Sequence, residues 1–187
     1  MATLTTVQQT ASAEEPVPAK MSIDQYLSTM FHPDCDFVDG RIEERNVGEV
    51  EHSKVQKMLL RLFAEYEGTL GIDALPEARL QVAKTRFRIP DVMVLGPGDN
   101  PHRIVRKAPL ICIEVLSPED TWKRLNEKLQ DYLAMGVPNI WAFDPEKRTA
   151  HRFDAGGLHL VMGPDLVVPG TEIRVIVAEV FSLLRKN

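Results

Sequence analysis

The sequence predicts a mixed α/β (or α+β) domain in which helices cover a β-sheet on both sides. Two long stretches, 50–67 and 118–135, place apolar residues at the spacing of one helical face. Short apolar runs typical of strands lie before, between and after them, and Gly, Pro and Asp residues mark their ends. Helices alternating with strands and hairpins in this order favour a sheet core flanked by helices.

Length and composition predict one soluble globular domain. The chain has 187 residues, of which 44% are hydrophobic and 26% charged, as is ordinary for this class. No apolar run approaches the roughly 20 residues that a membrane-spanning helix needs, so no membrane association is expected. Residues 1–20 are polar and rich in Thr, Ala and Pro, which predicts a disordered tail. The single folded domain is therefore expected over residues 21–187.

The start of the chain and its cysteines favour the cytoplasm. The first 20 residues lack the basic start and apolar centre of a secretory signal. Cys35 and Cys112 lie far apart, and Cys112 sits inside an apolar run. Two buried thiols in a reducing compartment are expected, with neither a disulfide framework nor zinc-ligand spacing.

The N-terminal half predicts two helices and a hairpin. A short helix is expected over 22–30, and Asp39 and Gly40 supply the positive φ values of a tight hairpin turn. The long helix over 50–67 follows, with Gly68 expected to end it.

The second half alternates strands with one long helix. The helix over 118–135 is expected to start with Ser117 as its N-cap and to end at Gly136. A short helical piece is expected near 177–185. Strands are expected at 78–84, 88–95, 109–116, 139–144, 149–154, 157–162 and 172–177.

The run 109–116 contains an anomaly, because Glu114 interrupts an otherwise apolar strand. A carboxylate among such neighbours loses hydration worth several kcal/mol unless a charge or a hydrogen-bond donor compensates it. Asp91 stands similarly at the head of the apolar strand over 88–95. Two carboxylates brought together at one edge of a sheet repel each other, and a hard divalent ion such as Mg²⁺ or Mn²⁺ relieves that repulsion. The alternative is that each acid pairs with an Arg or Lys.

Lys128 and His52 are the next candidates for this site. Lys128 borders the apolar face of the helix over 118–135, close to the end of the Glu114 strand. It is expected either to reach the acids and stabilise charge on a phosphate, or to extend to solvent. His52 shares the apolar face of the helix over 50–67, where it either orients groups at the site or bonds a backbone carbonyl in the core.

Weaker signals concern a third acid and a basic zone. Glu49, at the start of the long helix, is a candidate for a further metal ligand. The chain carries a net charge of −5, yet residues 79–107 contain seven Arg and Lys against two Asp. Arg86 and Arg88, just ahead of Asp91, are candidates for phosphate contacts, and a solvated surface is the alternative.

Several stretches together resemble a known family. "GEVEHSKVQ", "TRFRIPDV", "PLICIEVLSPED" and "DYLAMGVPNIWAFDP", with Lys128, are similar to the bacterial Uma-type restriction endonuclease family of the PD-(D/E)XK nuclease-like superfamily. The resemblance covers about residues 22–180. It implies a four-stranded mixed sheet with a metal site at one end, where Asp91 and Glu114 are the acids. The superfamily's usual lysine position holds Leu116, and the resemblance implies that Lys128 substitutes for it.

The expected function is a metal-dependent endonuclease acting on DNA. Asp91 and Glu114 would hold Mg²⁺ or Mn²⁺, with Lys128 and His52 as further catalytic residues. The alternative is a catalytically inactive nuclease fold that binds nucleic acid or a protein partner, and a hydrolase of small phosphoesters is more remote. DNA is the expected partner, a membrane is not, and a homodimer is left open.

Overall fold

The computed structural model describes residues 20–45 and 49–185, so all but the last residue of the expected tail lies outside it. Its helices are α1 (Ile23–Ser28), α2 (Val50–Leu70), α3 (Trp122–Met135) and α4 (Val177–Val180). The strands are β1 (Asp36–Val38), β2 (Arg41–Glu43), β3 (Asp73–Pro76), β4 (Leu80–Ala83), β5 (Arg86–Arg88), β6 (Val92–Leu95), β7 (Ile111–Val115), β8 (Asn139–Asp144), β9 (Thr149–Asp154), β10 (Gly157–Leu160), β11 (Asp165–Val167) and β12 (Arg174–Ile176). The mixed α/β class predicted from the sequence is confirmed.

A six-stranded sheet forms the centre of the molecule. Its strand order is β10-β9-β8-β7-β6-β3, with β7 and β8 parallel and every other neighbouring pair antiparallel. The sheet is larger than the four-stranded core that the resemblance implies, because β3 and β10 extend its two edges. The parallel pair requires a crossover, and α3 supplies it.

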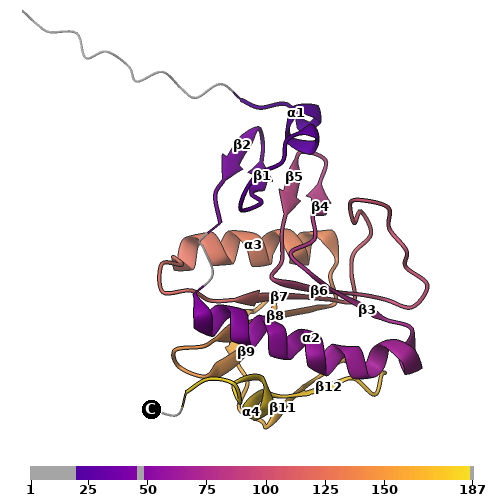
Figure 1. Cartoon of the computed structure of the whole chain (residues 1–187), viewed down its shortest axis with the longest axis vertical. Coiled ribbons are helices and arrows are strands. Elements are labelled where there is room, and N and C mark those ends of the chain that lie inside the picture. The colour runs from indigo at the N-terminus through magenta and orange to yellow at the C-terminus, as the bar shows by residue number, and fades with distance from the viewer. Residues whose placement is uncertain (1–19, 46–48, 186–187) are drawn as a thin grey trace, which may run out of the picture.

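Helices cover the two faces of this sheet, as Figure 1 shows with α3 above and α2 below it. Alternate residues of β7 point to opposite faces. Ile111 and Ile113 pack in the cluster that contains Val55, Leu59 and Phe63 of α2. Cys112 packs on the other face, in the cluster formed by α3. Glu114 has the same parity as Cys112 and therefore faces α3.

The antiparallel register of β6 and β7 places the two predicted acids opposite each other. Val92 pairs with Ile113 and Met93 with Cys112. Continuing this register by one residue sets Asp91 across from Glu114. Directly opposite residues on one face of a sheet have Cβ atoms about 5 Å apart. The pairing therefore forces two carboxyl groups into close proximity beneath α3.

A second, four-stranded sheet of order β2-β1-β5-β4 stands beside α3 and carries α1 at its end (Figure 1). Its own core consists of Tyr26, Phe37 and Phe87. The hairpin turn between β1 and β2 has φ of 51° at Asp39 and 93° at Gly40, as the sequence predicts.

Two predicted helix boundaries are wrong. The long helix passes through Gly68, at a cost of only about 1 kcal/mol, and ends at Gly71, which takes the left-handed conformation. Helix α3 begins at Trp122 instead of 118, because Thr121 accepts the N–H of Arg124 and is its N-cap. The predicted N-cap, Ser117, instead forms a turn with Asp120 before the helix. None of the helices within the described residues is both long and apolar enough to cross a membrane.

Arg88 ties the second sheet to α3. Its side chain is 1% exposed and forms ion pairs with Asp36, Glu43 and Asp131 at 3.2, 2.7 and 2.7 Å. Asp36 is fully buried, so Arg88 supplies the charge that compensates it.

We expect Arg88→Ala to lower the free energy of unfolding by about 3–5 kcal/mol, because it leaves the buried carboxylate of Asp36 without its cation. Urea unfolding followed by circular dichroism measures the change. Arg106→Ala, which removes an exposed arginine bonded to Gln81, is the control and should stay within about 0.5 kcal/mol of wild type. Equal stability of the two variants would contradict the assignment of Arg88 as a buried anchor.

Candidate active site

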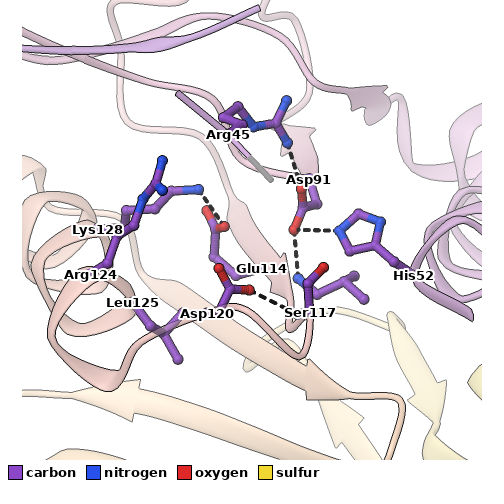
Figure 2. A pocket seen from close by; sticks show the side chains of 10 residues that line it. Arg45, His52, Asp91, Glu114, Ser117, Asp120, Arg124, Leu125 and Lys128 are labelled. Carbon is purple, nitrogen blue, oxygen red and sulfur yellow. Dashed lines mark hydrogen bonds and ion pairs between the residues drawn. The ribbon is translucent and has the colours of Figure 1, made fainter. Parts of the chain in front are cut away.

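A small pocket of about 40 Å³ opens where β6 and β7 meet the starts of α2 and α3. It has room for roughly two or three water molecules, or an ion with part of its hydration shell. Figure 2 shows the polar side chains that converge on it. The lining residues are Arg45, His52, Asp91, Glu114, Val115, Ser117, Asp120, Arg124, Leu125 and Lys128.

Asp91 is buried, and both of its oxygens are bonded. Oδ1 accepts from the Arg45 guanidinium at 2.6 Å, and Oδ2 accepts from the Val115 N–H at 2.7 Å. The Nε2 atom of His52 lies 3.3 Å from Oδ2. Burial alone would raise the pKa of Asp91, but the hydrogen bond from His52 and the charges of Lys128, His52 and Arg45 lower it to about 2. Asp91 is therefore ionised at neutral pH.

Both carboxylate oxygens of Glu114 are bonded as well, but the pKa of Glu114 is shifted in the opposite direction from that of Asp91. Its Oε2 accepts from the Lys128 ammonium at 2.5 Å, and its Oε1 accepts from the Tyr132 hydroxyl at 2.5 Å. Burial and the charge of Asp91 raise the pKa of Glu114 to about 7, against the opposing effects of Lys128 and Tyr132. Burial acts to lower the pKa of Lys128, yet attraction from Glu114 raises it, so the lysine stays charged. These contacts explain how an apolar strand tolerates a carboxyl group.

The structure thus brings Asp91, Glu114, Lys128 and His52 into one pocket, although their chemical roles remain predictions. Lys128 points inward to Glu114 instead of extending to solvent. His52 faces Asp91, and the charge and hydrogen bond of that carboxylate raise the pKa of the imidazole although burial acts to lower it.

Glu49 lies apart from this group. It precedes α2, is exposed, and lines a neighbouring pocket of about 320 Å³ that shares His52 with the first. Its role as a metal ligand therefore stays a proposal that needs the α2 terminus to approach the acids.

The donor set fits a hard divalent ion of the Mg²⁺ type. Among residues 20–45 and 49–185, no group of three or more His, Cys, Asp and Glu gathers to hold a metal. Mg²⁺ is nevertheless commonly held by one or two carboxylates with several waters, and Asp91 and Glu114 supply two on adjacent strands. Any such ion has to share these oxygens with Arg45 and Lys128.

The two arginines expected to contact phosphate have other partners. Arg86, 38% exposed in its side chain, bonds Asp39 and Asp131. Arg88 is buried, so a phosphate contact from its guanidinium would require its three ion pairs to break. Arg86 is the only one of the two that stays a candidate for DNA contact.

Three further residues contact the acids without being predicted as site residues from the sequence: Arg45, Gln56 and Tyr132. Gln56 donates to the backbone carbonyl of Asp91 at 2.9 Å. Tyr132 stands one helical turn after Lys128 on the same apolar face, and that spacing was a usable signal. Arg45 follows a hairpin in an irregular segment, where no periodicity distinguishes it.

Comparison with known proteins bears on the family and the fold. The family described as "Uma2: Putative restriction endonuclease" matches residues 24–170. The chain belongs to this family. The crystal structure of "a putative nuclease belonging to DUF820 from Anabaena variabilis ATCC 29413" is similar with a TM-score of 0.74 and 20% identity, over 87% of this chain and 98% of that one.

A DrdV–DNA complex is matched with a TM-score of 0.33 and 18% identity, over 71% of this chain and 13% of that one, a likeness too weak to bear on the fold. No curated protein matches the sequence. The Uma2 assignment and the Anabaena neighbour establish a nuclease-like chain with the fold predicted from its sequence.

We expect Glu114→Gln to stabilise the metal-free protein at alkaline pH. The folded-state pKa is raised from 4.5 to about 7, so wild type loses stability as pH rises through this window. Gln keeps the shape of the side chain and avoids that loss, which amounts to at most about 3 kcal/mol. Urea unfolding in EDTA at several pH values should show a gap that opens above pH 4.5 and levels off above pH 7.

Glu51→Gln, which changes an exposed acid on α2, is the control and should show no such gap. If Glu114→Gln instead loses several kcal/mol at pH 8, Glu114 serves mainly as the structural partner of Lys128.

Proposed function

We propose that this Uma2-family chain is a metal-dependent endonuclease that hydrolyses phosphodiester bonds in DNA. The observation that carries the proposal is the buried Asp91–Glu114 pair on adjacent strands, with the Lys128 ammonium 2.5 Å from Glu114. Two acids and a cation close together at one end of the central strands are the groups that phosphoryl chemistry with a divalent ion requires.

The division of labour follows from the contacts. A bound Mg²⁺ or Mn²⁺ would supply Lewis-acid activation of the phosphate and of a water molecule. Asp91, ionised at neutral pH, would hold this ion as an anionic ligand, and Glu114, whose pKa is raised to about 7, would be the second ligand in its ionised form. His52 and the Val115 N–H fix the orientation of Asp91. Lys128 places positive charge beside the acids, where it stabilises the negative charge that develops on the phosphate.

The position of Lys128 supports its role as substitute for the superfamily's strand lysine. Leu116, at the usual lysine position, packs partly buried against the apolar cluster beneath α3. Lys128 comes from α3 instead and enters the pocket from above the sheet. The ammonium group that contacts Glu114 is therefore carried by helix α3 and not by the residue two positions after Glu114.

A second candidate, an inactive nuclease fold that binds a partner, is favoured by one observation. Each acid already has a cation, Arg45 for Asp91 and Lys128 for Glu114, so the pocket is compensated without a metal. A hydrolase of small phosphoesters stays the more remote candidate, because such a substrate would have to extend from the 40 Å³ pocket into the neighbouring pocket of about 320 Å³. The free, buried state of Cys35 and Cys112 supports the proposed cytoplasmic location.

The proposal is tested on supercoiled plasmid, single-stranded DNA and RNA with Mg²⁺, Mn²⁺ or EDTA. We expect metal-dependent cleavage of DNA, reduced at least about 100-fold by Asp91→Asn, Glu114→Gln or Lys128→Met. Lys107→Met, which changes an exposed lysine paired with Asp99, is the matched control and should cleave like wild type. Binding of DNA without cleavage under every condition would favour the inactive module, and cleavage that survives Asp91→Asn would reveal a contaminant.

A further inference from the structure

Arg45 forms an ion pair with Asp91, but the proposed nuclease function assigns it no role in catalysis or binding. It follows β2, its side chain is 11% exposed, and it lies 2.6 Å from Asp91 Oδ1 and 3.5 Å from Glu77 Oε1. Burial acts to lower its pKa, but the charges of Asp91, Glu114 and Glu77 raise it, so the guanidinium stays charged. The Val115 N–H, in contrast, belongs to a strand and cannot leave Asp91 without breaking the sheet.

Arg124 reaches the same place from another element. It stands in the first turn of α3 and lines the pocket, and its guanidinium donates to the carbonyl oxygen of Glu44. That carbonyl belongs to the peptide that joins Glu44 to Arg45. Two arginines far apart in the sequence are thereby held beside one pocket, where Figure 2 draws Arg45 above Asp91 and Arg124 beside Lys128.

When Glu114 is ionised, the charges of the Arg, Lys, Asp and Glu side chains that line the pocket are balanced without any ion. Its lining contains three permanent cations, Arg45, Arg124 and Lys128, and three acids, Asp91, Glu114 and Asp120. A divalent ion added to this set leaves an excess of positive charge. The phosphate group of a substrate carries the compensating negative charge. Metal and phosphate should therefore favour each other's binding.

We propose that Arg45 is a phosphate-binding residue. In the free protein it forms an ion pair with Asp91 instead, and the bond from Arg124 to the Glu44 carbonyl holds its backbone beside the pocket. This inference rests on the proposed function and assigns the substrate contact that Arg88 is too buried to make. A guanidinium presents a planar fork of donors that matches two phosphate oxygens, so it exchanges one carboxylate partner for an anion of similar geometry. The same movement frees Asp91 Oδ1 for a metal ion.

The proposal predicts opposite effects of one substitution. Arg45→Gln removes the cation that competes for Asp91, so Mn²⁺ affinity without DNA should rise about fivefold or more. The same change removes a phosphate contact, so affinity for DNA in the presence of metal should fall roughly tenfold. A merely structural arginine would lower both affinities together.

Two binding measurements test these signs. Calorimetric titration with Mn²⁺ gives the metal affinity, and fluorescence anisotropy with a labelled phosphorothioate duplex, which resists hydrolysis, gives the DNA affinity and its salt dependence. The slope of log affinity against log salt should become shallower by about 0.9 in Arg45→Gln. Arg61→Gln, an exposed arginine on α2, is the matched control and should change neither affinity by a comparable factor.

Arg45→Lys provides a second variant in case the glutamine variant folds poorly. It keeps the competing charge but loses the fork, so metal affinity should stay within about twofold while DNA affinity falls. Weaker metal binding by Arg45→Gln, or unchanged DNA affinity in both variants, would overturn the assignment of Arg45.

The failure of the proposed activity would look different. If wild type cleaves nothing but Arg45→Gln still shifts the two affinities in opposite directions, the nuclease proposal fails and the phosphate contact stands. If wild type cleaves DNA and the Arg45 variants bind and cleave like it, only the assignment of Arg45 fails. If wild type binds no DNA at all, both fall together.

Discussion

The antiparallel pairing of β6 with β7 is the constraint on which the site depends. Its register sets Asp91 opposite Glu114 on the face that α3 covers. Two carboxyl groups so close in a buried position are unfavourable unless cations or donors compensate them. The two acids differ in their pKa values. Asp91, with a pKa of about 2, keeps its negative charge, whereas Glu114, with a pKa of about 7, holds its proton through much of the acidic range. Arg45, His52 and the Val115 N–H contact Asp91, and Lys128 and Tyr132 donate to Glu114.

The compensating groups come from elements outside the sheet, and this explains the architecture around it. Helix α2 supplies His52, α3 supplies Lys128, and the segment after β2 supplies Arg45. The second sheet therefore has a positional role, because β2 leads directly to Arg45. The buried ion pairs of Arg88 with Asp36, Glu43 and Asp131 lock that sheet against α3. A contact distant from the chemistry thus fixes the direction from which Arg45 approaches.

The sequence predicts the features that depend on residues close together in the chain, and it does not predict contacts between distant segments. An acid inside an apolar strand and a lysine beside an apolar helical face each interrupt a regular apolar pattern. The sequence alone therefore predicts Glu114 and Lys128 as site residues. Arg45 was missed because its partnership with Asp91 joins segments 46 residues apart, and the chain around it has no period. Charge counting marked a basic zone but could not separate exposed Arg86 from buried Arg88. The start of α3 was misplaced because both Ser117 and Thr121 are competent caps, and only packing selects between them.

The ion pairs that compensate the pocket also bear on the proposed activity. Presence of Asp91, Glu114 and Lys128 is not sufficient, because the same three residues with Arg45 form a compensated cluster that needs no ligand. The proposed activity would require that at least one of these cations exchange its carboxylate partner for a phosphate. Lys128 is buried on helix α3, while Arg45 lies outside any helix or strand and has a half-exposed second acid, Glu77, beside it. Under the proposed function, the exchange of Arg45 between Asp91 and a phosphate would therefore decide, together with the identity of the acids, whether metal and substrate bind at the same time.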